Sequence, residues 1–319
     1  MTAAPPGAGV SRPAAGPIWV RADRLPRPLV VVHGGAGSFP RPPTDARIER
    51  ELEGMRAALE AGWELLATGA PAIDAVVEAV DSMEADGVFN AGRGGVPTTG
   101  GVVETDAAVM DGATARAGGI CAATWPDHPV RVAKALADAG DALLLAGAGA
   151  DRFAADSGAP RRDPDLLTRG GDAPTADLGT VGAVALDMGG HLAAATSTGG
   201  RPGQRPGRVG DSPVVGAGTW ALDDSVAVSA TGAGEAFVLA GFAHRVDWAL
   251  RAGADLHRAA TEALYAVESW GGMGGAIAID PAGRVVVVCD TPAMAYGWRS
   301  ESGHVVDLRR AGDRRGGDT

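Results

Sequence analysis

The sequence is poor in cysteine, lysine and tyrosine. Its 319 residues include two cysteines and two tyrosines, and Lys134 is the only lysine. Cys121 and Cys289 lie far apart and belong to no Cys-x-x-Cys pair, which argues against a zinc ribbon and against a disulfide framework. This usage favours a reducing compartment, so we expect a cytoplasmic protein.

Basic residues are also scarce relative to acidic ones. The 28 lysines and arginines stand against 39 acidic residues, which gives a formal net charge of -11. No basic cluster with interleaved aromatic residues occurs, so we predict no nucleic-acid partner. Since no run of about 18 or more apolar residues occurs either, we expect no membrane-spanning segment.

Several familiar site motifs are missing as well. The six histidines form no His-x-x-x-His or His-x-His pair, which argues against a catalytic zinc. The stretch "HGGAGSF" (33–39) lacks the glycine spacing of a dinucleotide loop and the Gly-Lys-Ser/Thr ending of a P-loop, so we expect no organic cofactor. Asp211 and Ser212 superficially resemble a serine-hydrolase motif, but the chain has no Gly-x-Ser-x-Gly elbow.

The apolar pattern that is present predicts both helices and strands. Hydrophobic residues make up 45% of the chain, which is typical of a globular protein. Apolar residues at spacings of three and four predict helices over 48–66, 71–84, 129–140 and 255–269, and within 225–253 after a strand and a glycine turn. Alternating or β-branched runs predict strands over 180–187 and 191–200, a strand that ends in a tight turn over 28–39, and a hairpin over 274–288. Because strands and helices occur in both halves without strict alternation, we predict packed layers of sheet and helix rather than a Rossmann sheet.

A boundary lies within "TADLGTVGAVALD", residues 175–187. The residues before it, about 155–179, are crowded with Asp, Gly, Pro and Arg, and predict an exposed linker. The residues after it alternate small and branched apolar side chains like a strand buried on both faces. Thr180 stands at the boundary. Residues 1–28, rich in Pro, Ala and Gly and without the apolar core of a signal peptide, predict a disordered tail.

The segment that begins at this boundary carries a family resemblance. "GTVGAVALDMGGHLAAATSTGGRPGQRPGRVGDSPVVGAGTWA" (179–221), followed by "SATGAGEAF", resembles the plant-type asparaginase and isoaspartyl peptidase family of N-terminal nucleophile hydrolases. "VVHGGAGSF", "FNAGRGGV", "ETDAAVMDG" and "WGGMGGAIAID" extend the resemblance, in order, from about residue 29 to residue 280. It implies an α+β fold, a four-layer αββα sandwich that forms one folded domain.

The resemblance also implies that the chain cleaves itself between Gly179 and Thr180. Residues 29–179 would become the α subunit and 180–319 the β subunit, and two such αβ units would pair. A free α-amino group, with a pKa of roughly 7.7 to 8, can act as general base for its own hydroxyl, whereas an internal threonine has no such base. Taken alone, Thr180 could equally begin a strand without any catalytic role.

Family roles transfer to individual residues around this nucleophile. The resemblance implies that the hydroxyl of Thr198 lies beside Thr180, and that Thr231 and Gly232 form the oxyanion hole. Asn90 would lie near the nucleophile. The residue types alone also fit a small polar core residue for Thr198 and a strand-to-helix turn for the other pair.

Two charged residues would bind the substrate. In the family pattern, Arg208 holds the α-carboxylate and Asp211 the α-ammonium of an aspartyl group. Spacing alone favours a surface ion pair between these two residues. The family pattern further implies a sodium ion bound by backbone carbonyls, a donor that suits a hard cation; the residues are Met83, Glu84, Asp86, Phe89, Ala91 and Arg93.

The implied activity is hydrolysis of L-asparagine and of β-aspartyl dipeptides. An aspartylglucosaminidase and a threonine endopeptidase remain open, because both would use the same nucleophile. So does an unprocessed, catalytically silent protein that binds an amino acid through Arg208 and Asp211.

Overall fold

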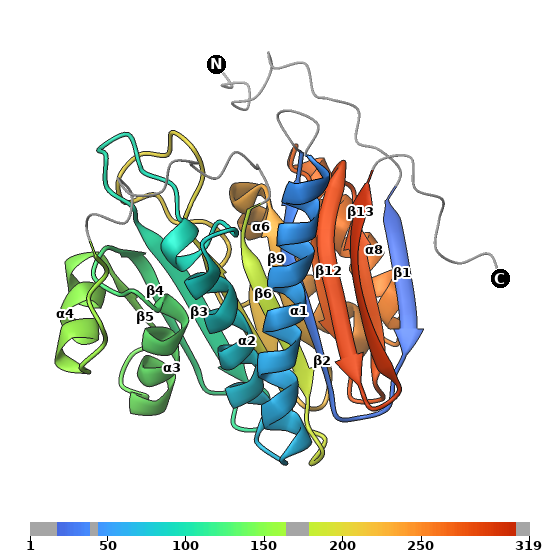
Figure 1. Ribbon diagram of the computed structural model, residues 1–319. Helices are drawn as coiled ribbons and strands as arrows, with labels where there is room; N and C mark the ends of the chain where they lie inside the picture. Colours follow the sequence, from blue (N-terminus) through green and yellow to red (C-terminus); the bar gives the residue numbers. More distant parts are fainter. Residues whose placement is uncertain (1–17, 39–43, 164–178, 311–319) are drawn as a thin grey trace, which may run out of the picture.

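The protein, seen here in a computed structural model that describes residues 18–38, 44–163 and 179–310, is a mixed α+β structure with two β-sheets (Figure 1). The eight-stranded sheet has the order β13 (Gly303–Arg310), β12 (Ala293–Ser300), β2 (Leu29–Gly37), β6 (Val181–Leu186), β7 (Leu192–Thr198), β3 (Thr105–Asp111), β4 (Ala117–Ala123) and β5 (Leu144–Ala146). The five-stranded sheet has the order β1 (Trp19–Arg24), β11 (Arg284–Cys289), β10 (Gly274–Ile279), β9 (Ala227–Gly232) and β8 (Thr219–Ala221). Strands from both sides of Thr180 therefore share each sheet.

The helices begin and end where local chemistry favours it. They are α1 (Asp45–Ala67), α2 (Ala72–Asp86), the 3-10 turn η1 (Gly92–Gly94), α3 (Pro129–Ala139), α4 (Ala148–Asp156), α6 (Gly234–Ala240), α7 (Phe242–Arg251) and α8 (Leu256–Ser269). The hydroxyl of Thr44 accepts a hydrogen bond from the backbone N–H of Arg47 and caps α1. Gly87, with φ of 81°, ends α2 in the left-handed conformation. The predicted helices are confirmed, and none within the described ranges has the length and apolar character needed to cross a bilayer.

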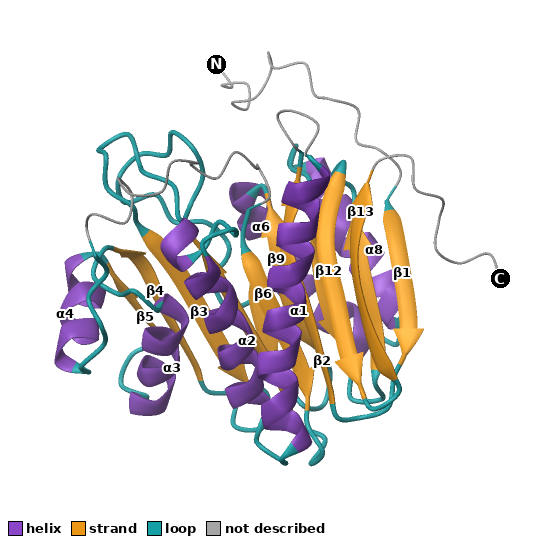
Figure 2. Cartoon of the chain, in the orientation of Figure 1, coloured by secondary structure: helices purple, strands orange, loops and turns teal. Residues whose placement is uncertain are grey.

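Three apolar clusters hold the sheets and helices together. Along β2, Val30 and Val32 face a cluster shared with α1 and α2, while Leu29 and Val31 face a second cluster between the two sheets. A third cluster packs α6, α7 and α8 against the five-stranded sheet. Figure 2 shows α1 and α2 in front of the eight-stranded sheet. Burial on both faces explains why β6 is continuously apolar and why β2 begins with four apolar residues, Leu29 to Val32.

Three sequence-based boundaries are wrong. Part of the predicted tail 1–28 is ordered: β1 pairs with β11, and Trp19 is buried between the sheets. The predicted turn within 28–39 is strand, since β2 continues through its glycines and pairs with β12 up to Gly37. The predicted linker begins too early, because α4 extends to Asp156 and Arg162 is buried with its N–H bonded to Trp125. Residues 1–17 and 164–178 lie outside the described residues. In each case pairing with a distant segment overrides local composition.

Candidate active site

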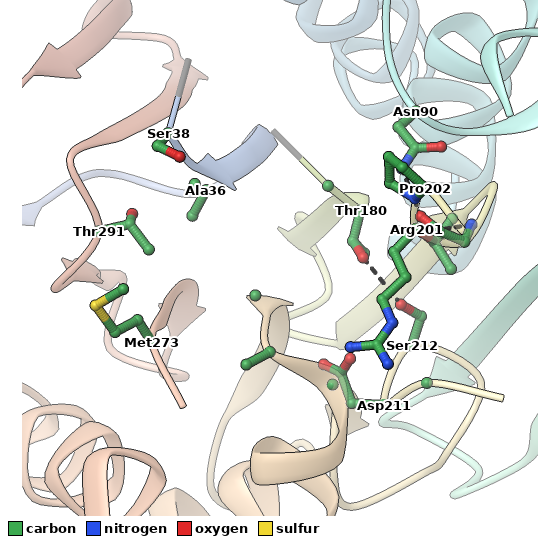
Figure 3. A pocket seen from close by; sticks show the side chains of 18 of the residues that line it. Ala36, Ser38, Asn90, Thr180, Arg201, Pro202, Asp211, Ser212, Met273 and Thr291 are labelled. Carbon is green, nitrogen blue, oxygen red and sulfur yellow. Dashed lines mark hydrogen bonds between the residues drawn. The ribbon is translucent and has the colours of Figure 1, made fainter. Parts of the chain in front are cut away.

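Thr180 lies in the wall of a cavity, immediately before β6. Val181 pairs with Ser197 across β6 and β7, and continuing that register by one residue sets Thr180 opposite Thr198. The cavity has a volume of about 410 Å³. Figure 3 shows Asn90, Thr180 and Ser212 on one side of it. Thr180 is 6% exposed, so its hydroxyl reaches solvent only through the cavity.

The cavity gathers the residues that the family pattern singled out. Its lining includes Asn90, Gly179, Thr180, Thr198, Arg208, Asp211 and Gly232. These residues come from the loop after α2, the ends of β7 and β9, and the long loop between β7 and β8. The structure thus brings together positions more than 140 residues apart in sequence. Thr231 does not line the cavity, but its Oγ1 would lie 3.8 Å from a Cβ built on Gly179.

The hydroxyl of Thr180 has one side-chain partner. Its Oγ1 lies 3.2 Å from Oγ of Ser212, and both residues are buried (Figure 3). Sequence analysis considered Ser212 only as part of a serine-hydrolase motif and set it aside. Its position next to Asp211 was the only signal that pointed to it. The hydroxyl of Thr198 accepts a hydrogen bond from the backbone of Gly200 at 3.2 Å, which fixes the start of the following loop.

The two residues assigned to the oxyanion hole lie at the end of β9, and the Thr231 hydroxyl has its proton available. Thr231 Oγ1 accepts a hydrogen bond from the backbone N–H of Ala36 at 3.2 Å, so its own proton is free for another acceptor. Gly232 lines the cavity with φ of 144°, a conformation that side chains disfavour. A Cβ there would press against the backbone of Met273 and Gly274. A glycine is therefore required at this position.

Arg208 is bound to a partner that sequence analysis missed. Its Nε and Nη2 donate to the two carboxylate oxygens of Glu235 at 3.1 and 2.9 Å. Arg201 reaches the same carboxylate at 3.4 Å. Glu235 is the first-turn residue of α6, and its sequence neighbours gave no reason to single it out. Two cations thus share one protein carboxylate at this side of the cavity.

Asp211 is buried without a cation in direct contact. It is 2% exposed, and within the part of the chain that the structure describes its Oδ2 has no hydrogen-bond partner, so the alternative of a surface ion pair with Arg208 is wrong. Burial raises the pKa of Asp211 to about 7, against the opposing effect of the nearby Arg208. An orphaned carboxylate oxygen in a cavity wall is suited to a cationic ligand, because a charge-assisted hydrogen bond would offset its desolvation.

Asp106 and Asn90 brace the loops that carry these residues. Asp106 accepts hydrogen bonds from the backbone of Ala122 at 2.6 Å and of Gly210 at 3.3 Å, and burial raises its pKa to about 6. Asn90 donates from Nδ2 to the carbonyl of Gly200 at 2.6 Å. Asp106 was not assigned a role from the sequence, although it lies within "ETDAAVMDG".

The six residues assigned to a sodium site follow one another around the C-terminus of α2. The last carbonyls of a helix lack intrahelical partners and carry partial negative charge. Among the described residues, no backbone N–H beyond the helix donates to the carbonyls of Met83, Glu84 or Asp86. The carbonyls of Phe89 and Ala91 follow in the loop, where they accept from the N–H groups of Ala91 and Gly94 at 2.9 and 3.0 Å and keep a second lone pair each, and Arg93 lies in η1. Such a donor set fits a hard monovalent cation.

A second group of potential metal ligands lies outside the cavity and is already satisfied. Asp81, Glu84 and His128 offer atoms within 4.8 Å of one another. Asp81 pairs with Nδ1 of His128 at 2.6 Å and with Arg131 at 2.7 Å, and Glu84 accepts from the backbone of Val130. The group is therefore an ion-pair network that joins α2 to α3.

Comparison with known proteins identifies the class of this cavity. The sequence model of a family described as asparaginase matches residues 26–172 and 168–306. The chain is 39% identical to an isoaspartyl peptidase of Salmonella typhimurium, over 85% of this chain and 94% of that protein. It is 40% identical to a plant-type L-asparaginase of Pyrobaculum calidifontis (84% and 96%) and 37% identical to an isoaspartyl peptidase/L-asparaginase of Homo sapiens (84% and 92%).

These matches define an amidohydrolase. The chain belongs to the asparaginase family, which confirms the resemblance found in its motifs.

Proposed function

We propose that the protein hydrolyses the side-chain amide of L-asparagine and the isoaspartyl bond of β-aspartyl dipeptides. The observation that carries the proposal is the position of Asp211, with its unpartnered buried oxygen, beside Arg208 in the wall that also holds Thr180. A free α-ammonium and a free α-carboxylate would satisfy this pair. Release of ammonia from L-asparagine and of aspartate from β-aspartyl dipeptides by the purified protein tests it.

The chemistry proposed begins with self-cleavage before Thr180. The freed α-amine takes the proton of the Thr180 hydroxyl as its oxygen attacks the β-carbonyl of the substrate. The hydroxyl of Thr231 and the N–H of Gly232 stabilise the oxyanion. The amine then gives its proton to the leaving group, ammonia or an amino acid. Water resolves the acyl-enzyme by the reverse sequence and releases aspartate.

The proposal extends to the architecture and the assembly. Helices on the outer face of each sheet, with one apolar cluster between the sheets, support the four-layer αββα sandwich of N-terminal nucleophile hydrolases. Large apolar side chains on the helices over the five-stranded sheet, Leu239 and Trp248 at 60% and 66% exposed, support pairing of two αβ units. The buried free cysteines support a cytoplasmic location. The carbonyls around the end of α2 would hold sodium as a structural ion, with no organic cofactor.

Activity should decrease as the pH falls below about 7. The pKa of Asp211 is raised to about 7, so at lower pH the carboxyl is neutral and binds an α-ammonium poorly. The α-amine of Thr180, with a pKa of roughly 7.7 to 8, loses its function as a base in the same direction. We expect log kcat/KM for L-asparagine to decline with at least unit slope from pH 7 to pH 5. A flat profile over that range would contradict both assignments.

Replacing Thr231 by Ala should lower turnover by about a hundredfold or more, the usual cost of losing one oxyanion donor. The measurement is kcat for L-asparagine on protein that has already been cleaved. Thr231→Ser is the matched control, because it keeps the donor and the bond from Ala36. A decrease of less than about fivefold in the Ala variant would show that Thr231 is not a donor to the oxyanion.

A further inference from the structure

A line of four close polar contacts crosses the space between the two sheets. Nε2 of His33 lies 2.9 Å from Oγ of Ser229, which lies 2.8 Å from Oγ1 of Thr196. Thr196 Oγ1 lies 2.6 Å from Oγ1 of Thr219, which lies 2.9 Å from the carbonyl oxygen of Ser212. All five residues are at most 1% exposed. Bulk water therefore cannot substitute for any of these hydrogen bonds.

The contacts alternate between the sheets. His33 and Thr196 belong to β2 and β7 of the eight-stranded sheet, whereas Ser229 and Thr219 belong to β9 and β8 of the five-stranded sheet. Gly182 of β6 leaves the room for this crossing. A Cβ on it would lie 2.6 Å from His33 Nε2 and closer still to Ser229 Oγ. The polar line thus occupies a space that the strand beside it keeps open.

Thr219 is the donor at one end of the line. Its hydroxyl lies in donor geometry toward both the carbonyl of Ser212 and Oγ1 of Thr196. Between Thr196 and Ser229 either hydroxyl can be the donor. The contact between Ser229 and His33 can run in either direction, according to which ring nitrogen carries the proton.

The hydroxyl of Thr196 can also donate to the carbonyl of Gly218, which lies 3.4 Å away, while it accepts from Thr219. Removing a hydroxyl from the line would leave a buried neighbour with an unmade hydrogen bond, which is costly in such a site.

The environment of His33 agrees with a neutral ring. Burial lowers the pKa of His33 to about 3, although the nearby backbone of Thr180 acts in the opposite direction. Its Nδ1 has no hydrogen-bond partner among the described residues. The ring therefore holds a single proton at neutral pH.

We propose that this line, from the ring of His33 to the carbonyl of Ser212, is a positioning device that holds the Ser212 hydroxyl against Thr180. Ser212 Oγ lies 3.2 Å from Thr180 Oγ1, and the same residue receives the last proton of the line at its carbonyl. With Ser212 held, its hydroxyl donates to Thr180 Oγ1 and favours transfer of the Thr180 proton to the α-amine. The inference rests on the proposed function in one respect, the role of Thr180 as nucleophile.

The protonation state of His33 can be observed directly. Nitrogen-15 NMR of the protein labelled at histidine should show a neutral His33 from pH 8 down to pH 5. The variant His33→Gln, which lacks the ring, assigns the signal. A charged ring in this range would overturn the proposal. This measurement needs no activity, so it stands even if the proposed substrates are wrong.

The positioning role can be tested by removing one hydroxyl from the line. Thr196→Val keeps the shape of the side chain and should lower kcat of the cleaved protein about tenfold, with KM within about twofold, because one buried hydrogen bond is lost. Thr196→Ser restores the hydroxyl and should recover most of kcat. Val184→Ala, a cavity in the same inter-sheet cluster, is the stability control and should lower Tm while kcat stays unchanged.

One result would contradict the positioning role of the line. If Thr196→Val lowered Tm as Val184→Ala does but left kcat equal to that of Thr196→Ser, the line would be structural only. If Thr196→Val failed to fold, the pair Thr219→Val and Thr219→Ser would make the same comparison one bond closer to Ser212.

Discussion

Replacing Thr180 by Ala should leave one uncut chain without measurable hydrolysis of L-asparagine. The substitution removes the oxygen that attacks both the Gly179–Thr180 bond and the substrate carbonyl. For a nucleophile, the expected loss of turnover is on the order of 10⁵-fold or more, which brings the rate to the background of the assay. A denaturing gel shows the chain as one band, against two for the parent. N-terminal sequencing of the parent's second fragment should begin Thr-Val-Gly.

Thr180→Ser is the control, because it keeps a hydroxyl and should still be cleaved. Normal cleavage of the Ala variant would show that another residue is the nucleophile. A parent protein that itself remained a single band would instead support the alternative of a silent binding protein, since the α-amine of Thr180 would never be freed.

N-acetylation of a β-aspartyl dipeptide should abolish its hydrolysis, with kcat/KM falling by about 10⁴-fold. A site built around a polar group of the substrate rejects an analogue that lacks it by this order, because the buried partner is left unpaired. Here the partner is Asp211, whose Oδ2 has no hydrogen-bond partner among the described residues. The measurement compares acetylated and free forms of the same dipeptide. An α-linked aspartyl dipeptide should also resist, since its scissile carbonyl takes the place of the free carboxylate.

Two variants separate the contributions of the charged pair. Asp211→Asn should lower kcat/KM for the free dipeptide but hardly change kcat/KM for the acetylated one. The ratio of the two values should therefore become smaller than in the parent. Arg208→Ala should lower kcat/KM for L-asparagine and for the dipeptide alike, because both present the same α-carboxylate. Efficient cleavage of the acetylated peptide by the parent would rule out an ammonium site at Asp211 and with it the proposed substrate class.

Local patterns predicted the helices and the position of Thr180, but not the pairing of distant segments. The amphipathic spacing of α1 and the turn residues of the β10–β11 hairpin are local signals, and the structure confirms both. Strand β1 was predicted as tail, because its partner β11 lies 260 residues later and composition does not record that contact. The same reason explains the glycines of β2, which are strand only because β12 lies beside them.

The active site likewise contains residues that the sequence could identify and residues that only the three-dimensional contacts reveal. Motif resemblance was sufficient to single out Arg208 and Asp211, which the structure places in one cavity wall. It did not find Ser212 or Glu235, whose relevance arises from contacts with Thr180 and Arg208. Nor could it identify the line from His33 to Thr219. These residues come from different strands, and the sequence does not show that they face one another between the two sheets.

Both sheets contain strands from each side of Thr180. A cut before Thr180 would therefore change how the protein can refold. Strand β2 lies between β12 and β6, and β1 borders β11, so neither fragment holds a complete sheet. An uncut chain refolds as a single molecule, whereas the cut form must find its complement in solution, a second-order event that slows with dilution. The proposed cut would therefore make unfolding effectively irreversible at low concentration. The cut protein would persist through slow opening of its native state rather than through repeated refolding.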